Sequence, residues 1–187
     1  TCNNNCNGTA TANPTSGTPP FTYLWTPGNF TTQTINGLCA GAYTCVVTDA
    51  TAQTSSGSYN VTAPSAVIAS TTSTNILCNN SCTGVANVTS SGGTGVHTYL
   101  WAPGGQTTAN VTGLCAGSYT VTVTDANGCS LTQTVNLTQP PALAAAATSN
   151  NITCNGANNG NATVTASGGV GPYTYLWAPS GGTAATA

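Results

Sequence analysis

Residues 113–129 read GLCAGSYTVTVTDANGC, and the fold class can be predicted from them. After Tyr119, valine and threonine alternate with a period of two, which is typical of a half-buried strand. The Asn127–Gly128 pair that follows is favoured in a tight hairpin turn, because both central positions of that turn need positive φ. The stretch therefore predicts antiparallel strands, and no helix is expected.

The same pattern recurs along the chain at a fixed spacing. Trp25, Trp101 and Trp177 lie 76 residues apart, without any gap. The same shift superposes four further columns: Cys2, Cys78 and Cys154; Tyr43 and Tyr119; Leu38 and Leu114; Asp49 and Asp125. Self-similarity at a fixed period is the signature of an array of repeated modules.

Proline-containing joints at 62–66 (TAPSA) and 138–142 (TQPPA) place the domain boundaries, because proline ends a strand and stiffens the chain. We expect a first repeat at 1–63 that lacks its opening strand, a complete second repeat at 66–139 and a truncated third repeat at 142–187. Each has short runs between Gly, Pro and Asn clusters. Such spacing predicts an all-β array of antiparallel β-sandwiches.

Five aromatic residues are candidates for the core of these sandwiches. Trp25, Trp101 and Trp177 occupy the position of the tryptophan on a central strand of an immunoglobulin-like domain, and Tyr43 and Tyr119 occupy that of its tyrosine corner. The alternative is that these side chains mark any half-buried strand.

Charge is almost absent from the chain. It has no Lys or Arg, and its formal charges are Asp49 and Asp125, with one imidazole at His97. Nucleic acids and anionic membranes are bound through Lys and Arg, so both are excluded as partners. Nine cysteines indicate an oxidising, extracellular compartment. No run approaches the ~20 apolar residues that a membrane span needs.

The motifs resemble a known family. CNG at 154–156, GGVGPYTYLW at 168–177 and LCAGSYTVTVTDANGC at 114–129 are similar to the SprB-type repeat of gliding-motility adhesins and other giant surface proteins of Bacteroidetes. The resemblance implies an extracellular Ig- or PKD-like module that is exported by type IX secretion and used in adhesion, gliding or filamentous appendages. The chain departs from the pattern in its extra cysteine pair per repeat and in its lack of Lys and Arg.

Each complete repeat carries four cysteines, which allow three connectivities. Three columns recur, while the fourth moves from Cys45 in the first repeat to Cys129 in the second. The third repeat keeps Cys154 but has Asn158 in the second column, which indicates that the second column pairs with the third. The predicted disulfides are Cys6–Cys39, Cys82–Cys115, Cys2–Cys45 and Cys78–Cys129, with Cys154 left unpaired.

A metal site is the rival interpretation of these cysteines. CNNNC at 2–6 and CNNSC at 78–82 have a loosely suggestive spacing, but zinc sites more often contain closer pairs or histidines. We therefore predict structural disulfides, with no metal and no cofactor.

Catalytic chemistry has few candidates. His97 and Asp125 could orient a nearby hydroxyl, but the His97 column holds Phe21 and Tyr173, which indicates a packing position. The aspartates precede the hairpin turn, where such a side chain binds its own backbone. The chain is predicted not to be an enzyme.

Three classes of function remain. The leading hypothesis is a structural and adhesive segment of a long cell-surface protein that forms a stalk, filament or appendage, assembles with identical chains, and grips external surfaces, cells or glycans. The alternatives are a glycan-binding module and an accessory domain of a secreted enzyme. Exposure of Tyr23, Tyr99 and Tyr175, or of the tryptophans, in an open cleft would favour binding, and their burial favours a scaffold.

Overall fold

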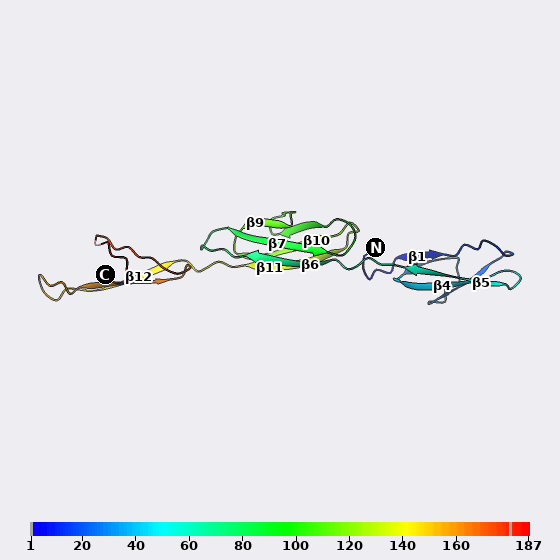
Figure 1. Ribbon diagram of the computed structural model, residues 1–187, viewed down its shortest axis with the longest axis horizontal. Helices are drawn as coiled ribbons and strands as arrows, with labels where there is room; N and C mark the ends of the chain where they lie inside the picture. The colour runs from blue at the N-terminus through cyan, green and yellow to red at the C-terminus, as the bar shows by residue number, and fades with distance from the viewer. Residues whose placement is uncertain (1, 180) are drawn as a thin grey trace. The chain divides into compact units, whose positions relative to one another are not determined.

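The computed structural model describes residues 2–179 and 181–187, and all of its regular elements are β-strands (Figure 1). No helix occurs among these residues, as the short strand-forming runs between turns predict. The strands are β1 (Gly8–Thr11), β2 (Thr22–Thr26), β3 (Thr34–Leu38), β4 (Gly41–Thr48), β5 (Thr54–Val61), β6 (Ile68–Thr74), β7 (Gly84–Ser91), β8 (Thr98–Ala102), β9 (Asn110–Leu114), β10 (Gly117–Thr124), β11 (Ser130–Leu137), β12 (Ala144–Asn150) and β13 (Asn161–Ser167).

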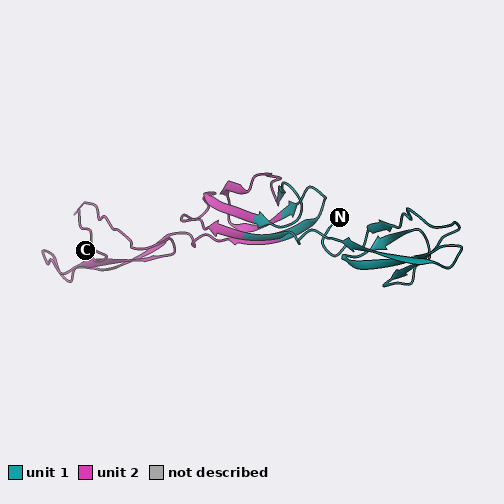
Figure 2. Cartoon of the chain, turned by 45° about the vertical axis from the view of Figure 1, so that its right-hand side comes forward, with its two compact units in different colours: residues 1–70, 90–100, 122–132 teal, residues 71–89, 101–121, 133–187 magenta. Residues whose placement is uncertain are grey.

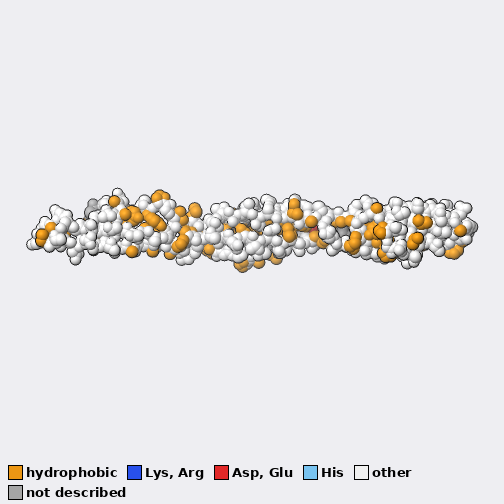
Figure 3. Space-filling view, turned by 90° about the horizontal axis from the view of Figure 1, so that it is seen from below, with side chains coloured by type: hydrophobic (Ala, Val, Ile, Leu, Met, Phe, Trp, Pro, Cys, Tyr) orange, Lys and Arg blue, Asp and Glu red, His pale blue; other side chains and the backbone are white. Residues whose placement is uncertain are grey.

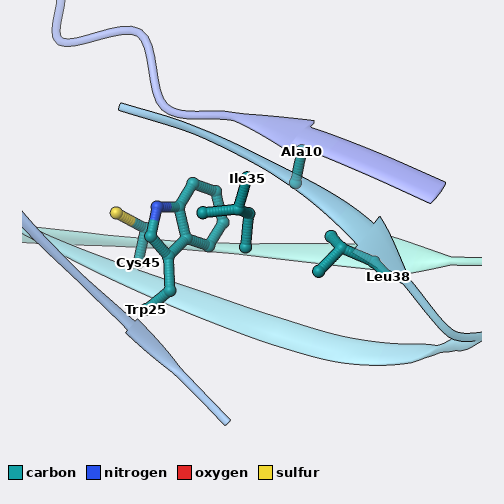
Figure 4. Close-up of a cluster of buried hydrophobic side chains, with 5 residues drawn as sticks. All are labelled: Ala10, Trp25, Ile35, Leu38 and Cys45. Carbon is teal, nitrogen blue, oxygen red and sulfur yellow. The ribbon is translucent and has the colours of Figure 1, made fainter. Parts of the chain in front are cut away.

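The first repeat contains two antiparallel sheets, in the strand orders β1-β3 and β2-β4-β5. Strand β4 is central in its sheet, and Trp25 on β2 lies opposite its Cys45. Because side chains alternate across a strand, Cys45 points inward, whereas its neighbour Val46 is 36 % exposed. Five inward-facing side chains form the core in Figure 4: Ala10, Trp25, Ile35, Leu38 and Cys45.

The second repeat has one more strand than the first, in the sheet orders β6-β7-β9 and β11-β10-β8. The register of β7 with β9 matches that of β1 with β3 after a shift of 76, since Ala86 pairs with Val111 as Ala10 pairs with Ile35. Its buried hydrophobic side chains are Ile76, Ala86, Val88, Trp101, Val111, Leu114, Val121, Val123, Val135 and Leu137.

The third repeat is the least buried part of the structure. Strands β12 and β13 pair in register from Ala144 opposite Ser167 to Asn150 opposite Asn161, and every residue of β12 is exposed. The YTYLW segment at 173–177, which the repeat pattern relates to β2 and β8, is not a strand here.

Hydrogen bonds recur with the 76-residue period. The indole N–H of Trp25 donates to the carbonyl of Thr32, seven residues later (3.0 Å). Trp101 and Trp177 donate in the same way to the carbonyls of Thr108 and Ala184 (both 2.9 Å). The predicted fold class, an all-β array with this period, is therefore confirmed.

The described chain divides into two compact units (Figure 2). One comprises residues 1–70, 90–100 and 122–132, and the other comprises 71–89, 101–121 and 133–187. The surface in Figure 3 carries no Lys or Arg, as the composition requires.

Candidate functional site: the joints between repeats

Two disulfides each join two cysteines of the same repeat. Cys6 is bonded to Cys39 and Cys82 to Cys115, with a sequence separation of 33 in both cases. These are the pairings that the column comparison predicts. Closing a loop of this size stabilises a small domain by about 4 kcal/mol, because the cross-link restricts the unfolded chain.

The other two predicted pairings are wrong. Cys2 is bonded to Cys129, with a sequence separation of 127 and a Cα–Cα distance of 5.4 Å. Cys45 cannot take that role, because it lies on the central strand β4 and points into the core beside Trp25. Cys45 is therefore a free, buried thiol, and burial raises its pKa.

The Cys2–Cys129 bond joins the start of the first repeat to the hairpin turn after β10 of the second repeat. Cys78 and Cys154, the column equivalents of Cys2, are free and exposed. Comparing columns places a cysteine within its repeat but does not say which repeat supplies its partner, and that is why the sequence prediction failed here.

The chain around this bond is held by hydrogen bonds. The side-chain amide of Asn3 donates to the carbonyl of Pro64 (2.9 Å), and the amide of Gly93 donates to the carbonyl of Ser65 (3.0 Å). Gly92 has φ +79°, and a Cβ there would collide with the backbone of Ala66. A glycine is thus required where this bend meets the linker.

The second joint repeats these contacts. Asn79 donates to the carbonyl of Pro140 (2.9 Å), and the amide of Gly169 donates to the carbonyl of Pro141 (2.8 Å). Gly168 has φ +70°, and a Cβ there would meet the backbone of Ala142. The linkers are therefore a conserved part of the repeat geometry within this chain rather than loose connections.

Asp125 organises the turn that carries Cys129. Its Oδ1 accepts the amides of Asn127 (2.9 Å) and Cys129 (2.8 Å), and its Oδ2 accepts the amide of Thr94 (2.8 Å). Burial raises the pKa of Asp125, but these hydrogen bonds outweigh it and the pKa lies below the usual value. The nearby His97 also lowers this pKa.

Asp49 has the same role in the first repeat. The amide of Thr18 donates to its Oδ2 (3.0 Å), and the amides of Thr51 (2.8 Å) and Gln53 (2.9 Å) donate to its Oδ1. Led by the bond from Thr18, these contacts lower the pKa of Asp49 to about 2. Both aspartates bind the turn backbone, as the sequence predicts.

The tryptophans of the first two repeats are core residues, but their strands β2 and β8 are edge strands and not the central strands that the sequence predicted. Trp25 and Trp101 are 2 % and 1 % exposed, whereas Trp177 is half-buried. Tyr43 and Tyr119 are half-buried as well, and their hydroxyls donate to the carbonyls four residues back, as a tyrosine corner requires: Cys39 (3.2 Å) and Cys115 (3.1 Å).

His97 takes part in a local hydrogen-bond network. Its Nδ1 lies 2.7 Å from the Ser90 hydroxyl, and its Nε2 lies 3.0 Å from the carbonyl of Gly92. The Ser90 hydroxyl also lies 3.0 Å from that of Tyr99. Because Ser90 and Gly92 are the partners of the two ring nitrogens, Asp125 does not orient this ring by a hydrogen bond. The network links β7 and the bend after it to β8.

No cluster of three or more metal-binding side chains occurs in the part of the chain that the structure describes. Cys2 and Cys6 of the CNNNC segment are both consumed by disulfides, which leaves no thiolate there. Among residues 2–179 and 181–187, no helix is long and apolar enough to cross a bilayer.

A cavity of about 490 Å³ opens in the first repeat. Its lining includes Phe21, Trp25, Asp49 and Tyr59, together with several Ser and Thr side chains. Trp25 contributes little surface, because it is almost fully buried, whereas Tyr59 is 50 % exposed. Neither Tyr59 nor this cavity was predicted from the sequence, because the lining residues come from separate segments of the chain. On β5, Ser55 and Gly57 occupy the positions of the larger Leu131 and Gln133 in the second repeat.

Antiparallel sheets, a 76-residue period and disulfides within and between copies define a disulfide-linked, all-β repeat protein. The family model of the SprB repeat matches residues 1–30, 70–106 and 146–184, which together are more than half of the chain. The chain belongs to the SprB repeat family, and the resemblance of its motifs is confirmed.

No curated protein matches this chain. Among solved structures, it is similar to one described as the structure of an amphioxus IgVJ-C2 molecule, with 13 % identity, a TM-score of 0.34, and coverage of 73 % of this chain and 98 % of that one.

Proposed function

We propose that the chain is a non-enzymatic, structural and adhesive segment of a long extracellular protein, which forms a cell-surface stalk, filament or attachment appendage used in adhesion, gliding or gripping. In this proposal, residues 1–63, 66–139 and 142–187 are successive copies of one module. Membership of the SprB repeat family supports the extracellular location, as do the three disulfides. Export by the type IX route is part of the same proposal.

One observation carries this proposal: the covalent bond between Cys2 and Cys129 crosses a joint between repeats. A ligand-binding module has no need to be bonded to its neighbour, whereas a load-bearing array gains from it. The burial of Trp25 and Trp101 favours a scaffold in the same way, since these rings are not available to a ligand.

Assembly with identical chains is the second part of the proposal. Leu24 on β2 and Leu100 on β8 occupy the same column, lie on edge strands, and are 47 % and 54 % exposed. With no Lys or Arg and two carboxylates, identical chains repel one another little. Analytical ultracentrifugation should detect association that the Leu24→Ser/Leu100→Ser variant loses, and a strictly monomeric chain at high concentration contradicts it.

The adhesive role is tested on the producing cells. Antibodies raised against this chain should label intact cells by immunogold microscopy, and their Fab fragments should reduce attachment to surfaces or other cells. Fab fragments against an unrelated surface protein serve as the control. Labelling only after permeabilisation, or undiminished attachment with the chain fully covered, rules out this role.

A glycan-binding role is the second candidate, and the cavity in the first repeat favours it. Its volume of about 490 Å³ suits a small ligand, and hydroxyl-rich walls beside Phe21 and Tyr59 suit a neutral sugar. Calorimetric titration of the chain with neutral oligosaccharides should then detect binding, and Tyr59→Ala should lower the affinity at least tenfold. Tyr173→Ala, outside the cavity, is the matched control, and an absence of heat with every sugar rejects this candidate.

A further inference from the structure

The disulfide between Cys2 and Cys129 gives tension two covalent routes through the chain. One route follows the polypeptide through residues 3–128, and the other crosses the disulfide, whose Cα atoms are 5.4 Å apart. The shorter route becomes taut first and then carries the load, whatever happens to the folded contacts along the longer one. This follows from connectivity alone.

We propose that the Cys2–Cys129 disulfide is a tension bypass, which carries a pulling force past residues 3–128. The bypassed segment contains strands β1 to β10 and both within-repeat disulfides. Force applied at the two ends of the chain reaches residues 1–2 and 129–187, and the bypassed strands are not drawn out.

Both ends of the bypass are anchored in ordered structure. Next to Cys2, the Asn3 side chain is hydrogen-bonded to the carbonyl of Pro64, and the amide of Cys129 is bonded to Asp125 Oδ1 at 2.8 Å. Cys129 also accepts, through its carbonyl, the amide of Asp125 at 3.0 Å. A cross-link that merely joined loose ends would lack these contacts on either side.

The disulfide also lies beside the linker. Cys2 and Cys129 share a hollow of about 350 Å³ with Ser65, Ala66 and Val67. The linker at 62–67, which has no strand of its own, is therefore spanned by a covalent bond. The second joint has the corresponding asparagine and glycine contacts, and Cys78 there is exposed and free.

This inference rests on the proposed load-bearing role, but its test is separate from that of adhesion. In single-molecule force spectroscopy, the oxidised 187-residue chain is pulled by handles at its two ends after its accessible free thiols have been alkylated. About 60 residues lie on the force route of the wild-type chain, which gives a fully extended length of about 20 nm at ~3.5 Å per residue.

The Cys2→Ser/Cys129→Ser variant should extend about twice as far as the wild-type chain, to roughly 40 nm, because only the two within-repeat loops then remain closed. Fully extended length depends on covalent connectivity and not on folding, so a poorly folded variant still gives a valid result. Equal lengths for the wild-type chain and this variant overturn the bypass. A failure of the adhesion test would leave these lengths unchanged.

The Cys6→Ser/Cys39→Ser variant is the matched control, because it opens a loop inside the bypassed segment. With the bypass intact, it should not lengthen the chain. In the Cys2→Ser/Cys129→Ser background, it should add about 11 nm, or roughly a quarter of the extension. An equal gain in both backgrounds also overturns the proposal, since force would then be passing through residues 3–128.

Discussion

The hydroxyl of Tyr119 donates a 3.1 Å hydrogen bond to the carbonyl of Cys115, whose sulfur is bonded to Cys82. The ring is half-buried, so this contact satisfies the polar end of a side chain whose body packs inward. Tyr43 and Cys39 have the same relationship in the first repeat, at 3.2 Å. The tyrosine corner of each of the first two repeats therefore holds the turn that carries one cysteine of the within-repeat disulfide, Cys39 or Cys115.

Replacing Tyr119 with Phe should destabilise the second repeat by about 1 kcal/mol, because the ring stays but the hydrogen bond is lost. For a domain of this size the melting temperature should fall by about 4–8 °C. Differential scanning calorimetry measures the change. Tyr59→Phe is the control, since that side chain is 50 % exposed. Equal melting curves for Tyr119→Phe and the wild-type chain would show that the bond adds no stability.

The fold should lose stability in acid, and two residues should account for it. Asp49 has its pKa lowered to about 2, and that of Asp125 is lowered too. A lowered folded-state pKa contributes stability that is complete above the unfolded value, about 4, and is lost as the pH falls through the folded value. Urea denaturation midpoints should therefore decrease from pH 5 to pH 2.

The Asp49→Asn/Asp125→Asn variant should be less stable at pH 7 and nearly independent of pH between 5 and 2. The reason is that the sequence has no other acidic side chain, and no Lys or Arg whose repulsion could unfold it in acid. A variant that kept the full acid sensitivity of the wild-type chain would show that these carboxylates are not its origin.

Thiol labelling should separate the three free cysteines. Cys78 and Cys154 are exposed and should react with a maleimide in the folded protein, whereas Cys45 should react only after unfolding. Burial of Cys45 acts twice, by blocking access and by raising its pKa. Mass spectrometry of the labelled peptides counts the sites, and labelling of Cys2 or Cys129 in the native state would contradict the disulfide between them.

Gly92→Ala should destabilise the first joint by more than the backbone strain alone. At φ +79° an added Cβ is strained by about 1 kcal/mol and also meets the backbone of Ala66, which cannot rotate away. Gly105→Ala is the matched control, because its φ is +69° but nothing lies within 4 Å of the added Cβ. Melting temperatures that fall equally would mean that the close approach has no cost.

Much of this structure could be predicted because it depends on local sequence. The turn aspartates could be assigned from Asp49 and Asp125 alone, since an Asx turn is completed within four residues. The within-repeat disulfides followed from their columns, since both partners belong to one copy. The cavity beside Tyr59 could not be predicted, because its walls come from segments that are separate in the sequence and meet only in the folded repeat.

The period of 76, the all-β class and the SprB family could all be recognised from the amino-acid sequence, because strand alternation and turn chemistry are properties of neighbouring residues. The folded structure was needed to show that Cys2 is bonded to Cys129 and that Cys45 is free. The repeat pattern does not distinguish a cysteine of one copy from the equivalent cysteine of another copy. Which copy supplies a partner depends on distance in space, and a joint brings together residues that the repeat pattern assigns to different copies.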